Sequence, residues 1–397
     1  MSELFASPAF LNTYLLKLQD IRTPWTVGTA DELDGYGHLI QKSKQLKSLD
    51  LQTERIGKDR QHGPLNGQLM AEKLFGPVLS QTLGAALELT KLKVKLQCIG
   101  TAPNPLLQAV DFTRLKSLSL EFDFHCEDRH LLEALTTLFA ERGSALKGFT
   151  YQGGSVARDT WERFLAHSPD CHCLCSGHFA TLKLLVLGAE LEIGEGEGCS
   201  PSAFTSQQLV RLCNQCKGLE HLAVGLAPVT ISESEEGSWG DFGLSVDAIS
   251  KLPHLKSLLI HNLPVAPEGS FLGGSEEAGE EEEEEEGREV YELRQELNSL
   301  RYLERLDAFT SRLYRRIAAT RGLKAATCLP YLSFGGCNDY VASEEGSKLW
   351  TRPPRFYYQA ACQTSKYGTT QTVASRISNV DVAYELGVLL GWGEQDY

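Results

Sequence analysis

The stretch "CKGLEHLAV", from Cys216 to Val224, places Cys216, Leu219, Leu222 and Val224 at steps of three, three and two residues. The final step of two predicts a short strand in which Leu222 and Val224 point to the same face of a sheet. Leu219 would enter the same core from the turn before that strand. A strand this short cannot bury its own apolar face, so we expect the stretch to be one unit of a larger, stacked structure.

The same spacing recurs along the chain. Its first leucine falls at Leu46, Leu89, Leu115, Leu146, Leu182, Leu219, Leu255 and Leu303, and a weaker ninth copy begins at Leu329. The steps between the eight clear copies range from 26 to 48 residues. Recurrence at such steps predicts repeated units whose strands pair side by side into a parallel sheet with a continuous core. Full burial of each leucine would contribute about 1.5–3 kcal/mol.

The segments between the copies show helical periodicity. In residues 206–218 an apolar stripe follows Ser206, the expected N-cap, and consists of Leu209, Leu212, Cys213 and Cys216. Comparable stripes predict helices over residues 128–143, 290–300 and 310–322, the second of which would pack its apolar side on the repeats. Alternating strands and helices predict an α/β solenoid, a horseshoe or arc with a parallel β-sheet on its concave face and helices on its convex face.

The repeated motif resembles that of leucine-rich-repeat proteins, with Cys216 placed as in their cysteine-containing subtype. The uneven steps are longer than the usual spacing of about 20 to 29 residues. They resemble the irregular repeats that follow the F-box in F-box/leucine-rich-repeat proteins. The resemblance covers roughly residues 40–335 and implies a substrate-recognition subunit of a cullin–RING ubiquitin ligase. The first 25 residues predict one amphipathic helix, over residues 7–20, which is too short for an F-box, and the F-box itself is not found.

These patterns divide the chain into three parts. Residues 1–40 would form an N-terminal helical cap, residues 41–335 about eight or nine irregular leucine-rich repeats, and residues 336–397 a C-terminal capping segment. Seven consecutive glutamates repel one another and stay solvated, so residues 269–287 are expected to be a disordered acidic insertion between repeats.

Composition bounds the class of protein. The 397 residues are 42% hydrophobic and 23% charged, as in a soluble globular protein, and no apolar run reaches the ~18 to 20 residues of a membrane-spanning helix. Nine glutamates between Glu276 and Glu286 account for most of the net charge of −14, and no broad basic surface is indicated. We therefore expect neither nucleic acid nor a membrane as partner. Eleven scattered cysteines are typical of reduced thiols, which favours the cytoplasm or the nucleus.

One cysteine-rich stretch raises the question of a metal. "PDCHCLCSGH" offers thiolate and imidazole ligands suited to zinc, from Cys171, Cys173, Cys175 and His178. Structural zinc sites favour two separated pairs of ligands, and this stretch has no second pair, so an ordinary loop is the favoured interpretation. The motifs of hydrolases, metalloproteases and nucleotide-binding loops are absent from the sequence. We expect no catalytic residue, metal or cofactor, and a zinc-binding protein or an α/β hydrolase stays as an alternative.

The residues that alternate with the strand leucines would point onto the concave face. They are polar in the first copies, as at Asp50 and Lys93, and apolar in the middle copies. We expect a non-enzymatic interaction module whose protein partner is anchored on this face by Leu184, Val186, His221, Ala223, Leu259, His261, Arg305 and Phe309. The first alternative is that a C-terminal segment or a loop covers this patch as ordinary core. The second is a ubiquitin-ligase subunit whose F-box is absent from this chain.

Overall fold

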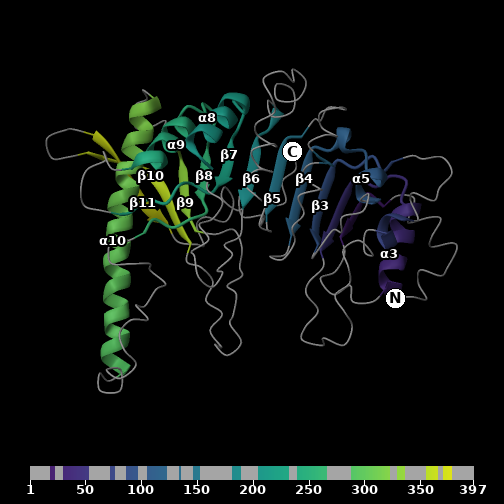
Figure 1. Ribbon diagram of the computed structural model, residues 1–397, viewed down its shortest axis with the longest axis horizontal. Coiled ribbons are helices and arrows are strands. Elements are labelled where there is room, and N and C mark those ends of the chain that lie inside the picture. Colours follow the sequence, from purple (N-terminus) through teal and green to yellow (C-terminus); the bar gives the residue numbers. More distant parts are fainter. Residues whose placement is uncertain are drawn as a thin grey trace. The chain divides into compact units, whose positions relative to one another are not determined.

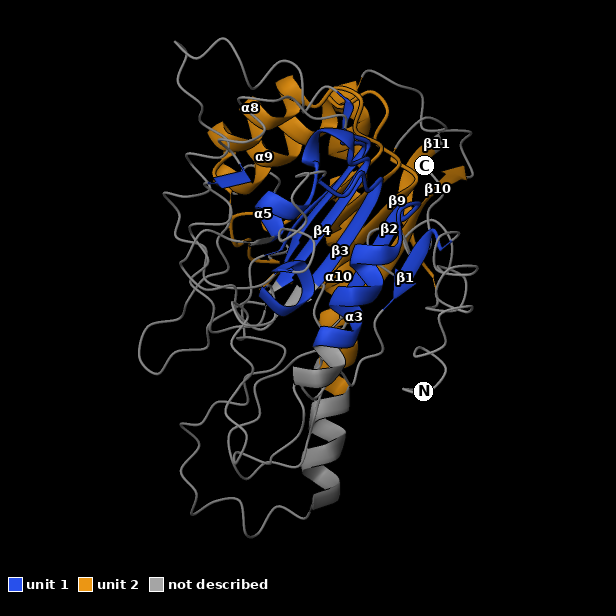
Figure 2. Cartoon of the chain, turned by 90° about the vertical axis from the view of Figure 1, so that its right-hand side faces the viewer, with its two compact units in different colours: residues 1–202, 396–397 blue, residues 203–395 orange. Residues whose placement is uncertain are grey.

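The computed structural model shows an α/β protein (Figure 1). It describes residues 18–22, 30–52, 72–76, 86–96, 105–122, 134–135, 146–152, 181–188, 204–231, 239–265, 288–321, 329–335, 355–364 and 370–377. The chain divides into two compact units, which Figure 2 colours separately. Unit 1 comprises residues 1–202 with 396–397, and unit 2 comprises residues 203–395. No helix among the described residues is both long and apolar enough to cross a membrane.

Unit 1 contains six strands that pair in chain order, each parallel to the next. They are β1 (Asp20–Arg22), β2 (Ser48–Gln52), β3 (Lys91–Leu96), β4 (Ser117–Phe122), β5 (Gly148–Gln152) and β6 (Leu184–Gly188). Strands β2 to β6 each begin two residues after the first leucine of a repeat copy, which confirms the predicted strands. The expected parallel sheet is also confirmed for these copies.

Strand β1 was not predicted, because residues up to Asp20 were assigned to an amphipathic helix. That assignment is wrong at its three described residues, because Leu18 and Gln19 are not helical and Asp20 begins the strand. Ile21 is the one buried residue of the three, and it lies in register with Leu49 of β2. A three-residue strand with a single apolar side chain gives almost no periodic signal in the sequence.

The core of unit 1 follows the repeat spacing. The middle leucine of each copy, or the phenylalanine that replaces it, lies in register with its neighbours on adjacent strands and is at most 1% exposed: Leu49, Leu92, Leu118, Phe149 and Leu185. The first leucines, before the strands, are buried as well.

The described helices of unit 1 include α3 (Ala30–Lys42), α5 (Pro105–Ala109) and the 3-10 turn η2 (Phe112–Arg114). Of the helix expected over residues 128–143, only residues 134 and 135 are described, and both are helical.

Unit 2 continues the same pattern and then departs from it. Strands β7 (His221–Val224), β8 (Ser257–Ile260) and β9 (Tyr331–Phe334) are parallel and begin two residues after Leu219, Leu255 and Leu329. The weak ninth copy is therefore confirmed as a strand. Strands β10 (Phe356–Thr364) and β11 (Thr370–Ile377) are antiparallel, and β10 pairs with β9. The helices are α8 (Ser206–Gln215), α9 (Gly240–Ser250) and α10 (Arg288–Arg321).

Helix α8 forms where the sequence predicted it, but its N-cap is Thr205 rather than Ser206. The Thr205 side chain accepts a hydrogen bond from the Gln208 backbone N–H, and the Gln208 side chain accepts one from the Thr205 N–H. This reciprocal pair is a capping box, which satisfies two N–H groups that the helix leaves unpaired. The predicted stripe is buried, from Leu209 to Cys216.

The strand predicted at Leu303 is wrong, because this copy lies inside α10. The buried residues of the helix here include Leu306, Phe309, Leu313 and Ile317, which recur at three- and four-residue steps. The two helices predicted on either side of the copy are one continuous helix of 34 residues. The expected packing of its first part also fails where its side chains are described, because Leu297 and Leu300 are 49% and 58% exposed.

The second half of α10 packs on α9 and on the C-terminal strands. Phe309 lies against Trp239 and Phe242, with ring centroids 5.1 and 5.8 Å away, and these rings bury a large apolar area. Arg321 donates hydrogen bonds to the carbonyl of Ser250, the last residue of α9, and to the carbonyl of Leu252 just beyond it. A cation at the C-terminal end of a helix is favourable because the unpaired carbonyls carry partial negative charge.

Candidate functional site: the polar face of unit 1

The side chains that alternate with the apolar core residues of β1 to β5 make up the polar face of unit 1. Their register places Arg22, Asp50, Lys93, Ser119 and Thr150 in one row across β1 to β5. Each member of the row is exposed or half-buried, whereas the apolar residues next to it along each strand are buried. This alternation confirms the prediction that the first copies present polar residues on the face away from the core.

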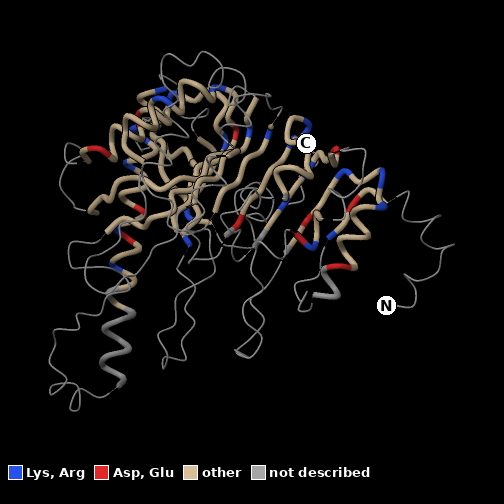
Figure 3. The backbone as a smooth tube through the Cα atoms, turned by 45° about the vertical axis from the view of Figure 1, so that its right-hand side comes forward, with Lys and Arg blue, Asp and Glu red and all other residues tan. Residues whose placement is uncertain are grey.

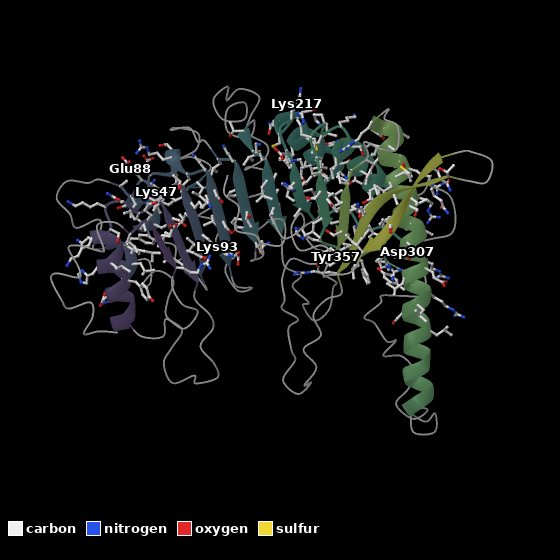
Figure 4. The ribbon with its side chains drawn as sticks, turned by 180° about the vertical axis from the view of Figure 1, so that it is seen from behind. Lys47, Glu88, Lys93, Lys217, Asp307 and Tyr357 are labelled. Carbon is white, nitrogen blue, oxygen red and sulfur yellow. The ribbon has the colours of Figure 1, made fainter. Side chains whose placement is uncertain are left out.

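Charged pairs cross neighbouring strands on this face. Arg22 Nε lies 3.2 Å from Asp50 Oδ2, and Lys93 Nζ lies 3.0 Å from Glu121 Oε1. The Asp50 and Glu121 side chains are only 14% and 19% exposed, so the cations lie over carboxylates that are largely withdrawn from water. In Figure 4 Lys93 is labelled farther along the strands, whereas Lys47 and Glu88 are labelled near the end where the strands begin. The face therefore combines both signs of charge with the hydroxyl groups of Ser119 and Thr150, which the strands hold at fixed positions.

The apolar residues expected to anchor a partner are interior. Leu184 and Val186 of β6 are 9% and 1% exposed, and Ala223 and Leu259 in unit 2 have no exposed surface. His221 is 7% exposed, and its Nδ1 lies 2.7 Å from the Ser257 Oγ. A partner cannot contact these side chains without rearrangement. They do not form a surface patch, and the alternative interpretation, that this part of the face is ordinary core, agrees with their burial.

The three other expected anchors do not form a row on the sheet. Arg305 and Phe309 lie on α10 rather than on a strand, and Phe309 has no exposed surface. His261 is half-buried directly after β8, where its backbone N–H donates to the carbonyl of Val224 over 3.1 Å. Both assignments on α10 failed because they depended on the strand that the structure replaces with helix.

The candidate zinc ligands Cys171, Cys173, Cys175 and His178 lie outside the described residues, as does the acidic insertion. In the part of the chain that is described, no group of three or more His, Cys, Asp or Glu residues is arranged to hold a metal ion. Cys213 within α8 and Cys216 at the C-cap of that helix are buried free thiols. Burial raises the pKa of Cys213 to about 12, and burial together with the neighbouring Cys213 raises the pKa of Cys216 further. Both thiols are therefore protonated at neutral pH and are poor nucleophiles.

Two features of the fold were missed in the sequence. The first is a lysine that recurs directly after the first leucine of a copy. In unit 1 these lysines form what we name the lysine row: Lys47, Lys116, Lys147 and Lys183; Lys256 has the same place in unit 2, where it pairs with Glu220. The signal for this row was present in the repeated "LK" pair.

The second feature is Asn262, whose side-chain amide donates to the Leu226 carbonyl over 2.9 Å and accepts from the Leu226 N–H over 3.0 Å. This amide continues the β7–β8 pairing beyond the strands, and a single asparagine gave no signal for it.

In comparisons with known proteins, no protein-family model matches the chain, and no curated protein matches it in sequence.

Proposed function

We propose that the chain is a non-enzymatic leucine-rich-repeat protein that binds a protein partner through the polar face of unit 1. In this proposal the repeat copies are successive turns of a solenoid, and the polar face lies on its concave side. The observation that carries the proposal is the row of partly exposed polar side chains that runs in register across five parallel strands. A rigid row of this kind holds its groups in place before a partner arrives, which lowers the entropy lost on binding.

The chemistry of the face favours a protein partner with a mixed polar surface. Neighbouring strands are about 4.7–4.9 Å apart, so a partner that lies across them meets a new side chain at each step. Lys93 and Arg22 have several N–H groups each and can donate further hydrogen bonds to carboxylates of a partner, and the hydroxyls of Ser119 and Thr150 can both donate and accept hydrogen bonds. Mixed charges of this kind contribute to the choice of partner more than to raw affinity. The apolar anchors are not part of the proposed surface, because they are buried.

The compartment belongs to the same proposal. The described cysteines are free thiols, including the exposed Cys362, and free thiols are typical of the cytoplasm and the nucleus. A cytoplasmic or nuclear protein partner is therefore the one we propose.

The test is affinity purification with mass spectrometry of three forms of the full chain. The first is the wild type, the second carries Ser119→Arg with Thr150→Arg on the polar face, and the third carries Gln108→Arg. Gln108 is exposed on α5, away from the strands, so this variant controls for an added surface charge. Circular dichroism and urea unfolding check that all three forms fold.

We expect the face variant to lose a protein that the wild type and the Gln108→Arg form both recover. Recovery of the same proteins by all three forms would contradict the proposal. Recovery of cullin–RING subunits with the wild type would narrow the function to a ubiquitin-ligase substrate receptor, which is the function that the family resemblance implies.

A further inference from the structure

The lysine row lies at the end of the unit 1 sheet where its parallel strands begin. Lys47, Lys116, Lys147 and Lys183 each directly precede a strand, β2, β4, β5 and β6 in turn, and Thr90 takes the same place before β3. Figure 4 labels Lys47 at this end of the sheet. Figure 3, in which Lys and Arg are blue, shows basic positions at this end of the strands.

Backbone hydrogen bonds fix the spacing of the row. The Lys47 carbonyl accepts from the N–H groups of Thr90 and Lys91, at 2.7 and 3.0 Å. The pattern repeats from strand to strand, since the carbonyls of Thr90, Lys116 and Lys147 each accept from the two residues at the same place on the next strand. Adjacent strands are about 4.7–4.9 Å apart, so Lys116, Lys147 and Lys183 follow one another at intervals of about 5 Å.

The charges of three lysines in the row, Lys47, Lys116 and Lys147, are not neutralised by the described residues around them. Lys47 and Lys116 are exposed and Lys147 is half-buried, and none of these three ammonium groups has an ion pair or hydrogen bond with a described residue. The nearby carboxylates are engaged elsewhere, because Glu88 pairs with Arg114 and Asp111 accepts from the backbone N–H and hydroxyl of Thr113. Like charges on adjacent strands repel one another. A partner with negative charge would relieve this repulsion.

We propose that the lysine row binds an extended acidic segment of a protein that runs across the strand ends. The row is a single line of lysines, one for each strand that has one, whereas nucleic-acid binding calls for a broad basic surface. In an extended peptide the residues follow at about 3.4 Å, and the four-carbon stems of the lysines can adjust to that spacing. This site uses other residues than the polar face, so the inference does not depend on the function proposed above.

The probe is a fluorescein-labelled peptide of ten glutamates, titrated with the full chain and followed by fluorescence anisotropy. The test variant carries Lys116→Glu with Lys147→Glu. The matched control carries Lys42→Glu with Lys44→Glu, which changes the net charge equally at exposed lysines of the same unit that lie outside the row. Because Lys147 is half-buried, the single variant Lys116→Glu is measured as well, and circular dichroism checks each fold.

We expect the wild type to bind the peptide and to lose most of that binding as salt rises from about 50 to about 500 mM, because exposed charges are screened. Each lysine replaced should weaken binding by a factor of about two to five, and the double charge reversal by about tenfold or more. The Lys42/Lys44 control should stay within about twofold of the wild type.

Three results would overturn the inference. The first is an equal loss in the control variant, which would show an effect of net charge alone. The second is tighter binding of a ten-nucleotide thymidine strand than of the peptide, which would indicate a nucleic-acid site. The third is no peptide binding, either by the wild type or by a form in which the nine glutamates between Glu276 and Glu286 are changed to glutamine, since that form removes competition from the chain's own acidic run.

Discussion

Arg316 of α10 and Asp247 of α9 form a two-point ion pair, with Nε 2.8 Å from Oδ1 and Nη2 2.8 Å from Oδ2. The same guanidinium lies over the Trp239 ring, 5.5 Å from its centroid. Paired hydrogen bonds of this geometry are stronger than single ones and fix the relative orientation of the two groups. In unit 2 this pair therefore ties the long helix α10 to α9, beside the aromatic cluster of Trp239, Phe242 and Phe309.

The first prediction concerns the pH dependence of this pair. Hydrogen bonding from Arg316 holds the pKa of the Asp247 carboxyl below its ordinary value of 3.8. A lowered pKa in the folded state contributes stability above the ordinary value, and that stability is lost as pH falls through the lowered one. We expect Asp247→Asn to reduce the free energy of unfolding by about 1 kcal/mol at pH 7, a value that allows for solvent screening of this partly exposed pair.

Urea unfolding of the wild type and Asp247→Asn between pH 7 and about pH 3 measures this effect. The difference between the two proteins should shrink as pH falls below about 4. Glu304→Gln, at an exposed position on the same helix, serves as the control and should change stability little at any pH. A difference that stays constant down to the lowest pH would show that the carboxylate charge is not what stabilises the pair.

The second prediction concerns two helical glycines that should respond in opposite directions to alanine. Replacing a glycine inside a helix by alanine usually adds roughly 0.5–1 kcal/mol of stability, because alanine loses less conformational freedom on folding. At Gly35 in α3 nothing lies within 4 Å of the added methyl group, so Gly35→Ala should give this gain. At Gly243 in α9 the methyl group would lie 3.1 Å from Arg316 Nη2 and 3.2 Å from Trp239 Cβ.

Gly243→Ala should therefore lower the free energy of unfolding by about 1 kcal/mol, because the Arg316 guanidinium and Trp239 must shift to admit the methyl group, which strains the two hydrogen bonds from Arg316 to Asp247. Urea midpoints of both variants, compared with the wild type, test the pair. A stabilising effect at Gly243 would mean that the guanidinium shifts without losing its carboxylate partner.

The third prediction compares leucines on one helix. Leu297 and Leu300 of α10 are about half exposed, whereas Leu306 and Leu313 have no exposed surface. We expect Leu306→Ala and Leu313→Ala each to cost about 2–5 kcal/mol, since each leaves a cavity in the core. Leu297→Ala and Leu300→Ala should each change stability by less than about 0.5 kcal/mol. Thermal or urea unfolding decides this, and similar costs at all four positions would show that the first part of the helix is packed.

The strands could be predicted because each copy carries a step of two residues that only an extended chain places on one face. Eight strands begin two residues after the first leucine of a copy for this reason. The copy at Leu303 was wrongly predicted to be a strand, because its first step of three residues is equally compatible with a helix. The residues around this copy distinguish it from the copies that form strands. Residues 288–321 contain no glycine or proline to end a helix, whereas Gly188, Gly225 and Gly335 follow other copies closely.

The candidate site was predictable in one respect only. Alternation shows which face of a strand a residue occupies, and it correctly separated Asp50 and Lys93 from the core leucines. It does not show what packs on that face, because such packing depends on residues far away in the sequence. Leu184 and Leu259 were therefore placed on the correct face but with the wrong exposure.

The antiparallel pairing of β10 with β9 limits how this protein can grow in evolution. Tyr357 and Tyr358 lie opposite Ser333 and Leu332, so the hydrogen-bonding positions that a further parallel strand would need are occupied by a chain running the other way. A duplicated repeat inserted between existing copies would find parallel neighbours on both sides. The same duplication placed directly after Phe334 would find a parallel neighbour on one side only, because β10 runs antiparallel to β9, so a new strand has parallel pairing on both sides only when the repeat is inserted before β9.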